Sequence, residues 1–340
     1  MNSEMGKDKN LHVPTSAVRN DGLLLEAFDI RRTFGETVAL DGCSLPIRSG
    51  EIHALVGENG SGKSTLIKIL SGIMPPGSGT LNWLGEPARF RSPRAAQEAG
   101  IATVFQETLV LPDMSVRDNV VLGLDGLVRR RATPAHEREM VRTALSLLGM
   151  EDLEIERLAG SLSLAGRQKV SIARSLMRPW RLLILDESTS ALDIEDRDRL
   201  FELLRKFRDE GRSILFVSHR MDEIENIADR TTVLRSGLSV ATLDCASCSS
   251  EMLLDLMSAR KAGRAEPVSG KRNSCGRDGR PALEVRGFSL RTGADHLDLD
   301  VHPGEILGVG GLEGHGQEAF LEYVAGCRSG PSGRIRAGDA

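Results

Sequence analysis

The chain has 340 residues, of which 40% are hydrophobic and 27% charged, and its formal net charge is −4 at pH 7. This composition is typical of a folded globular protein, and the length predicts two domains rather than one. It excludes a disordered chain and a collagen-like fibre. Because the net charge is negative, nothing draws the whole chain to nucleic acid, and we expect no nucleic-acid partner.

Two features of the sequence predict a cytosolic chain. No run approaches the roughly 20 consecutive apolar residues that span a bilayer, and residues 1–22 contain no apolar core of the signal-peptide kind. The five cysteines are odd in number and scattered along the chain, as expected where thiols stay reduced.

An internal repeat organises the sequence. Eight residues of the first half recur 254 residues later: Gly50, Glu51, Ile52, Gly57, Gly60, Gly62, Gly72 and Gly79 return as Gly304, Glu305, Ile306, Gly311, Gly314, Gly316, Gly326 and Gly333. The preceding pairs Leu25-Glu26 and Leu283-Glu284 are 258 residues apart, so the second copy has lost four residues before its glycine loop. Phe34 lies in the stretch that was shortened.

The repeat predicts four segments. Residues 1–22 are a flexible N-terminus, residues 23–258 a first complete domain, residues 259–281 a linker rich in glycine and basic side chains, and residues 282–340 the N-terminal part of a second copy. The second copy is too short to bury a core of the first copy's kind. It is therefore either a truncated domain or part of a cropped chain.

Short apolar runs alternate with helical patterns throughout the first copy. This alternation predicts an α/β domain with a mainly parallel sheet and helices on both faces. In such sheets ligands gather at the carboxyl ends of the strands, so we expect the functional residues there.

A complete phosphate-binding loop follows the strand that ends at Val56. Its nine residues are Gly57, Glu58, Asn59, Gly60, Ser61, Gly62, Lys63, Ser64 and Thr65. The glycines let backbone N–H groups turn toward phosphate oxygens, and the following helix adds the positive end of its dipole. Lys63 reaches the outer phosphates and Ser64 ligates Mg²⁺.

Three further polar groups follow apolar strands. Asp186 and Glu187 end the run from Leu182, and we expect Asp186 to hold Mg²⁺ while Glu187 faces an attacking water. Gln106 follows a strand that ends at Val104, and His219 follows the strand through Val217 and Ser218. A lone histidine or glutamine after a strand is more often structural, and an acid pair alone is as often a plain loop start as a functional site. Only the combination with the phosphate loop favours a catalytic role.

In this order and spacing the motifs resemble those of ATP-binding cassette (ABC) subunits of transporters, from about Leu23 to Leu256. The resemblance implies a P-loop ATPase fold with a mainly parallel sheet, an antiparallel β subdomain and a helical subdomain between Asp113 and about Gly160, followed by the start of a degenerate second copy. It implies that Phe34 stacks on adenine.

The resemblance also assigns the other loops. Gln106 senses the γ-phosphate, joins the Mg²⁺ ligands and touches the membrane partner, while His219 completes the γ-phosphate site. Residues 190–193 form a dimer-contact loop.

The signature segment departs from the family pattern. Where the family has Leu-Ser-Gly-Gly-Gln, this chain has Leu162-Ser163-Leu164-Ala165-Gly166, and two glycines are replaced by larger residues. In the second copy Gln317 stands at the place of Lys63 and Glu318 at the place of Ser64, which removes a phosphate-binding cation and adds an anion. A weak first signature beside a decayed second loop is similar to the fused double cassettes of monosaccharide importers, the ribose, galactose and xylose class.

The resemblance implies a protein that binds and hydrolyses ATP with Mg²⁺ to energise import of a sugar-type solute. Its partners would be membrane permease subunits, indirectly a periplasmic or extracellular solute-binding protein, and a second cassette half in trans or in a complete chain. The chain would lie at the cytoplasmic face of the membrane. Two alternatives stay open: a soluble tandem cassette acting on the ribosome or DNA, and a nucleotide-binding remnant without turnover.

Overall fold

The computed structural model describes residues 22–124, 133–258, 280–289, 296–310, 317–327 and 332–337. The chain divides into two units, residues 1–261 and 262–340, which are described separately. Residues 1–21 of the predicted N-terminal segment (1–22) and residues 259–279 of the predicted linker (259–281) lie outside the described residues.

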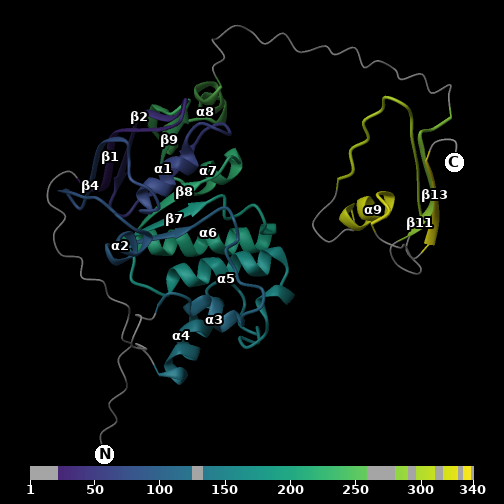
Figure 1. The fold of residues 1–340 in the computed structure, drawn as a ribbon, viewed down its shortest axis with the longest axis horizontal. Helices are drawn as coiled ribbons and strands as arrows, with labels where there is room; N and C mark the ends of the chain where they lie inside the picture. The colour runs from purple at the N-terminus through teal and green to yellow at the C-terminus, as the bar shows by residue number, and fades with distance from the viewer. Residues whose placement is uncertain are drawn as a thin grey trace, which may run out of the picture. The chain divides into compact units, whose positions relative to one another are not determined.

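A largely parallel sheet lies at the centre of the first unit (Figure 1). Its strand order is β10-β9-β3-β8-β7-β6, and all neighbours pair in parallel except the edge strand β10. The strands are β3 (Ile52–Val56), β6 (Ile101–Val104), β7 (Leu182–Asp186), β8 (Ser213–Val217), β9 (Arg230–Arg235) and β10 (Leu238–Asp244). Every residue of β3, β7 and β8 is buried, as expected for a parallel sheet covered on both faces.

An antiparallel sheet covers one face of the parallel sheet together with two helices. Its order is β2-β1-β4-β5. The elements of this layer are β1 (Leu23–Phe34), β2 (Thr37–Arg48), α1 (Lys63–Leu70), β4 (Ser78–Trp83), β5 (Glu86–Pro87) and α2 (Pro93–Glu98). Leu182 and Ile184 of β7 pack into the core of this layer, whereas Leu183 and Leu185 face the opposite side, because side chains alternate along a strand.

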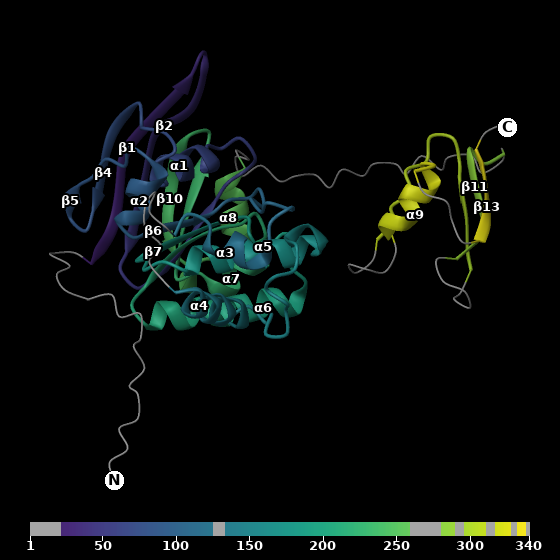
Figure 2. The same ribbon diagram turned by 60° about the horizontal axis from the view of Figure 1, so that its bottom comes forward.

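Helices cover the other face. They are α3 (Val116–Val121), α4 (Pro134–Ser146), η1 (Ala159–Ser161), α5 (Leu164–Leu176), α6 (Ile194–Asp209), α7 (Met221–Ile227), η2 (Cys245–Ser247) and α8 (Ser250–Met257). Figure 2 shows the antiparallel strands on one side of the first unit and α4 and α6 on the other. The layers confirm the predicted α/β class with parallel, antiparallel and helical parts.

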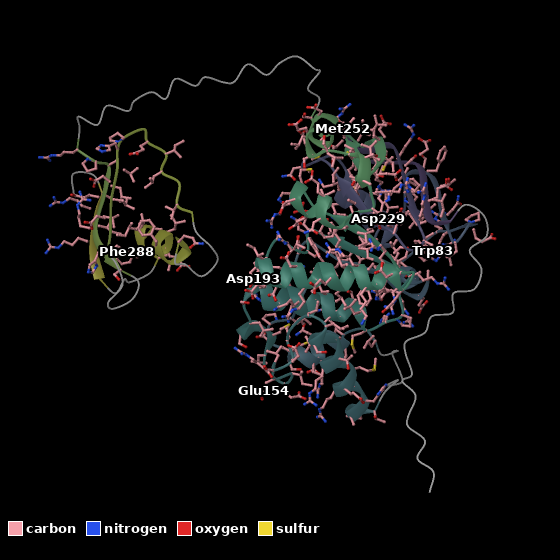
Figure 3. The ribbon with its side chains drawn as sticks, turned by 180° about the vertical axis from the view of Figure 1, so that it is seen from behind. Trp83, Glu154, Asp193, Asp229, Met252 and Phe288 are labelled. Carbon is pink, nitrogen blue, oxygen red and sulfur yellow. The ribbon has the colours of Figure 1, made fainter. Side chains whose placement is uncertain are left out.

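The predicted helical subdomain is the end of the first unit that contains α3, α4 and η1, packed against α5. Asn119 is fully buried there, and its amide donates to the carbonyls of Leu111 and Ser115 while its side-chain oxygen accepts from the Leu111 N–H. These bonds fix the loop before α3. Figure 3 shows Glu154 at this helical end and Trp83 at the antiparallel sheet.

The second unit repeats the register of the first. It contains β11 (Leu283–Ser289), β12 (Leu297–Val301), α9 (Gln317–Val324) and β13 (Ser332–Ala337), with strand order β12-β11-β13. Helix α9 and strand β13 begin 254 residues after α1 and β4. The strand pairing is also repeated. Ile30 pairs with Cys43 in the β1–β2 hairpin, and their counterparts Phe288 and Leu297 pair with each other in β11–β12. The four lost residues therefore fall within this hairpin.

The second unit has its own small core. Phe288 contacts Phe320 at 5.1 Å and Tyr323 at 5.0 Å between ring centroids. Ile306, the counterpart of the fully buried Ile52, is 98% exposed. Within the described residues, the segment that forms the central strand β3 in the first unit is therefore not covered in the second.

Candidate functional site

The strand order of the parallel sheet brings the predicted site residues to one edge. Strands β3, β8, β7 and β6 are neighbours in that order, and all four point the same way. Their carboxyl ends lead to the phosphate-binding loop, His219, Asp186 with Glu187, and Gln106. Four segments that are far apart in the sequence thus meet at one place.

Two glycines of the phosphate-binding loop are required by close packing. A Cβ on Gly57 would come 2.2 Å from the Leu234 carbonyl oxygen, and one on Gly62 would come 2.5 Å from the Ala39 carbonyl oxygen. Gly62 also has a φ of +107°, which side chains disfavour. The loop is therefore pressed against the backbone behind it, with Glu58, Asn59, Gly60 and Ser64 exposed and Thr65 half-buried.

Lys63 is held inside this loop. Its side chain is buried, and Nζ donates to the carbonyl oxygens of Gly57 at 2.7 Å and Glu58 at 3.0 Å. Burial lowers the pKa of the Lys63 ammonium, and the charges of Glu187 and Asp186 act in the opposite direction. Both hydrogen-bond acceptors are neutral, so they satisfy the ammonium without cancelling its charge.

The N-terminus of α1 adds backbone donors beside Lys63. The first N–H groups of a helix have no partner within the helix. Gly62 caps α1 without a side-chain hydrogen bond. The neighbouring Ser61 hydroxyl is buried with no hydrogen-bond partner. Donors next to a buried cation are what an anion with several oxygens would bind.

The acid pair lies at the end of β7. Burial, and next the neighbouring Glu187 carboxylate, raise the pKa of Asp186 to about 6, although Lys63 and Lys68 oppose the shift. Glu187 leaves the strand with a φ of +48°, while its N–H still donates to the Val217 carbonyl at 3.0 Å. A non-glycine residue in this region is strained, and such strain is common at functional sites.

Glu187 is the centre of a three-residue cluster. The Gln106 amide Nε2 donates to Glu187 Oε2 at 3.0 Å, and His219 Nδ1 lies 3.5 Å from Glu187 Oε1. Gln106 and His219 come from β6 and β8, the strands on either side of β7. The structure thus brings these three predicted residues together.

Phe34 stands apart from this cluster in the described contacts. It ends β1, is 44% exposed, and has the Arg32 guanidinium 5.1 Å from its ring centroid. An exposed ring with a cation beside it can stack on a flat aromatic ligand. Arg32 was not predicted from the sequence.

The signature segment forms the start of α5. Ser163 caps the helix, accepting from the Gly166 N–H at 3.1 Å, and Leu164 is 51% exposed at the first helical position. The predicted dimer-contact loop ends at Asp193, which Figure 3 labels. The Asp193 side chain caps α6 by accepting from the Asp196 N–H at 2.8 Å.

Sequence reasoning missed a buried acid behind the cluster. Glu223 in α7 is fully buried, and its Oε2 accepts from the hydroxyls of Thr189 and Ser218. The available signal was an acid on the apolar stripe that includes Ile224 and Ile227.

The second copy carries Gln317 and Glu318 after its glycine loop. Its residues 311–316 lie outside the described residues, as does the Glu318 side chain. Gln317, at the place of Lys63, is the first residue of α9.

Comparison with known proteins identifies the first unit. The family described as ABC transporter matches residues 40–190. The first unit is an ABC ATPase domain. Among solved structures, that of cbiO1 from Clostridium perfringens, part of the ABC transporter complex cbiONQ, has a TM-score of 0.59 and 27% identity, and the match covers 69% of this chain and 93% of that one.

Relatives extend the similarity beyond the ABC ATPase domain. The ribose import ATP-binding protein RbsA 1 of Mesorhizobium japonicum is 38% identical over 316 residues, which covers 92% of this chain and 60% of the relative. The ribose import ATP-binding protein RbsA 3 of Rubrobacter xylanophilus is 39% identical over 310 residues, covering 90% and 61%. The chain thus spans about three fifths of the length of these relatives.

The raised pKa of Asp186 predicts a stability effect. The folded chain binds this proton more tightly than the unfolded chain, so the cost of the buried carboxylate is complete above about pH 6 and shrinks as the pH falls from 6 toward the ordinary pKa of 3.8. We expect Asp186→Asn to raise the free energy of unfolding at pH 8 by about 1 to 3 kcal/mol, and by roughly half as much at pH 5. Thermal or urea unfolding without nucleotide measures both.

The control for this prediction is Asp113→Asn, which changes an exposed aspartate of the same domain. An equal gain at both pH values, or a loss of stability at pH 8, would contradict the electrostatic explanation.

Proposed function

We propose that this chain is the ATP-binding and hydrolysing subunit of an importer for a sugar-type solute. The observation that carries the proposal is the meeting of Lys63, Asp186, Glu187, His219 and Gln106 at one edge of the parallel sheet. A buried cation, exposed backbone donors and a positioned carboxylate are the parts that phosphoryl transfer to water needs.

ATP would lie along the phosphate-binding loop. The N-terminus of α1 and Lys63 would bind the β- and γ-phosphates, and Phe34 would stack on the adenine. The loop's close-packed glycines support this placement, because they let the loop lie against the backbone behind it while residues 58–60 stay exposed.

The donor set near the phosphates fits Mg²⁺. A carboxylate from Asp186, a hydroxyl from Ser64 and an amide oxygen from Gln106 are hard oxygen ligands. The described residues hold no group of three or more His, Cys, Asp or Glu that could bind a metal alone, which agrees with an ion shared with phosphates. When bound, Mg²⁺ would neutralise charge on the phosphate oxygens.

Glu187 is our general base. Its carboxylate oxygens face Gln106 and His219, so both neighbours orient the group that would take a proton from water. His219 and Gln106 would position the water and the γ-phosphate. The chemistry consists of positioning and electrostatics, and it requires no covalent protein intermediate.

Closure of the site would need a second cassette half. The ABC ATPase domain offers only the signature Leu162–Gly166, whose exposed Leu164 stands where a phosphate would approach. The 98% exposure of Ile306 supports further strands, from a continuing chain or from another one, completing the second unit.

The partners and the location are inferred from the relatives' names. Both are named as ribose import proteins, so we propose permease subunits as direct partners, an extracytoplasmic solute-binding protein as an indirect one, and the cytoplasmic face of the membrane as the location. No helix in the described part of the chain combines the length and apolar character needed to cross a bilayer. A role on the ribosome or DNA is not favoured by these names or by the net charge of −4.

The first test of this function counts nucleotide sites. We expect one Mg·ATP site per chain, lost in Lys63→Ala because its cation contacts phosphate, and unaffected in Gln317→Ala. Calorimetric titration measures the stoichiometry. Lys206→Ala, an exposed lysine of α6 in the same domain, is the control. Two sites of similar affinity would refute the assignment.

The second test concerns the general base. Glu187→Gln should keep or tighten ATP binding, since the neutral side chain fills the same space, while turnover of the complete transporter falls by about 10² to 10⁴. Glu202→Gln, on the exposed side of α6, should leave both unchanged. Unchanged hydrolysis in Glu187→Gln would move the base to another residue.

The third test concerns the signature. We expect the 340 residues alone to bind ATP and hardly hydrolyse it, because the available signature carries Leu164 and Ala165 in place of glycines. The ATPase rate per site should rise when Leu164→Gly, Ala165→Gly and Gly166→Gln are combined, or when a natural C-terminal half is added. If the unmodified chain already matches the extended protein, Leu162–Gly166 is a competent signature.

A further inference from the structure

Glu223 is a charged side chain in an apolar position. It lies in the first turn of α7 and is 0% exposed, next to the buried Ile224 on the stripe that packs into the domain. A buried carboxylate is costly unless hydrogen bonds compensate it. A carboxylate is therefore stable at this position only if hydrogen-bond donors or a cation contact it.

One carboxylate oxygen of Glu223 joins the loop that follows β7 to the loop that follows β8. Its Oε2 accepts from the Thr189 hydroxyl at 2.8 Å and from the Ser218 hydroxyl at 2.7 Å. Both partners are themselves 2% exposed. The other oxygen, Oε1, lies 3.1 Å from an Arg220 guanidinium nitrogen.

The two partners flank the reacting groups. Thr189 follows Glu187 by two residues, and Ser218 directly precedes His219. Ser218 Oγ also accepts from the Arg220 N–H at 3.1 Å, which fixes the turn after His219. A bond from each loop to the same charged oxygen sets the distance between the loops, and charge-assisted bonds are the strong kind.

The strained backbone of Glu187 needs such support. With a φ of +48°, its conformation persists only if the surrounding contacts impose it. The Glu187 N–H bond to Val217 fixes one side of the turn, and the Thr189 bond to Glu223 fixes the other.

We propose that Glu223 is a positioning residue for hydrolysis. It holds the loop after β7, which contains Glu187, at a fixed distance from the loop after β8, which contains His219. Its side chain is 0% exposed, and it acts through Thr189 and Ser218. The proposal rests on the proposed function, because it takes Glu187 and His219 to work on the same γ-phosphate and water.

The test uses the chain together with a second cassette half and the permease subunits proposed above. We expect Glu223→Ala to lower kcat by about 10- to 100-fold, since a misplacement of about 1 Å has that cost. The KM for ATP should change by less than about twofold, because the phosphate-binding loop is untouched. Asp222→Ala, an exposed acid in the same helical turn, should change neither.

The conservative variant separates positioning from charge. In Glu223→Gln one amide oxygen can still accept from both hydroxyls, so most of the kcat should return. Thr189→Val and Ser218→Ala should each lower kcat, and each should have little further effect in the Glu223→Ala background. A purely structural role predicts instead that activity per folded molecule stays constant in all variants.

A second measurement avoids turnover. In the 340-residue chain, amide hydrogen exchange should speed up in residues 187–190 and 218–220 together in Glu223→Ala, and stay near the unmodified rate in Glu223→Gln. Thr189→Val and Ser218→Ala serve if the alanine variant does not fold. Faster exchange in only one loop would overturn the coupling.

The outcomes also separate this inference from the function it rests on. If Glu187→Gln abolishes turnover while Glu223→Ala leaves kcat unchanged, the positioning role is wrong and the function stands. If Glu187→Gln has no effect on turnover, the proposed function fails, and unequal exchange of the two loops would then overturn the structural part of the inference as well.

Discussion

The chemistry of this chain depends on parallel pairing between strands that are distant in sequence. β3 pairs with β8, β8 with β7 and β7 with β6, so strand ends from residues 56, 217, 186 and 104 lie side by side. Parallel strands need long crossover connections, and these connections supply the helices that cover the sheet. The phosphate-binding loop therefore lies at the same edge of the sheet as Gln106, Glu187 and His219. Without this order Gln106 and His219 could not both face Glu187.

Burial disfavours two opposite charges at that edge. The ammonium of Lys63 and the carboxylate of Asp186 are both buried, and in each case desolvation shifts the pKa toward the neutral form. Each group opposes the other's shift, yet neither is neutralised by direct contact. A ligand with phosphate oxygens and a divalent cation would supply a partner for both groups, because the phosphate would pair with the Lys63 ammonium and the cation with the Asp186 carboxylate. The same burial that costs stability would therefore favour binding of the proposed nucleotide with a metal ion.

The sequence was sufficient to place the motifs that depend on local spacing. Gly57 to Thr65 and the pair Asp186-Glu187 lie in short motifs next to apolar strands, and the resulting strands and helix are where they were predicted. Arg32 and Glu223 were missed because their partners are set by tertiary packing. Thr189 and Ser218 come from separate strand ends, and no spacing along the chain shows that they meet at one oxygen of Glu223. Only the strand order makes that contact visible.

The second copy keeps residues that serve the fold of the repeat and changes residues that would bind phosphate. Its antiparallel strands keep the register of the first copy, and α9 occupies the place of α1. The retained parts bury Phe288 and Phe320 and so have a packing reason to persist. The changed parts are those that would meet phosphate, since Lys63 is replaced by Gln317. A neutral side chain at that place removes phosphate attraction without disturbing the helix. The described antiparallel strands thus share their register, whereas the copies differ in the charge at the phosphate site and in the segment of β3, which is exposed at Ile306 in the second unit.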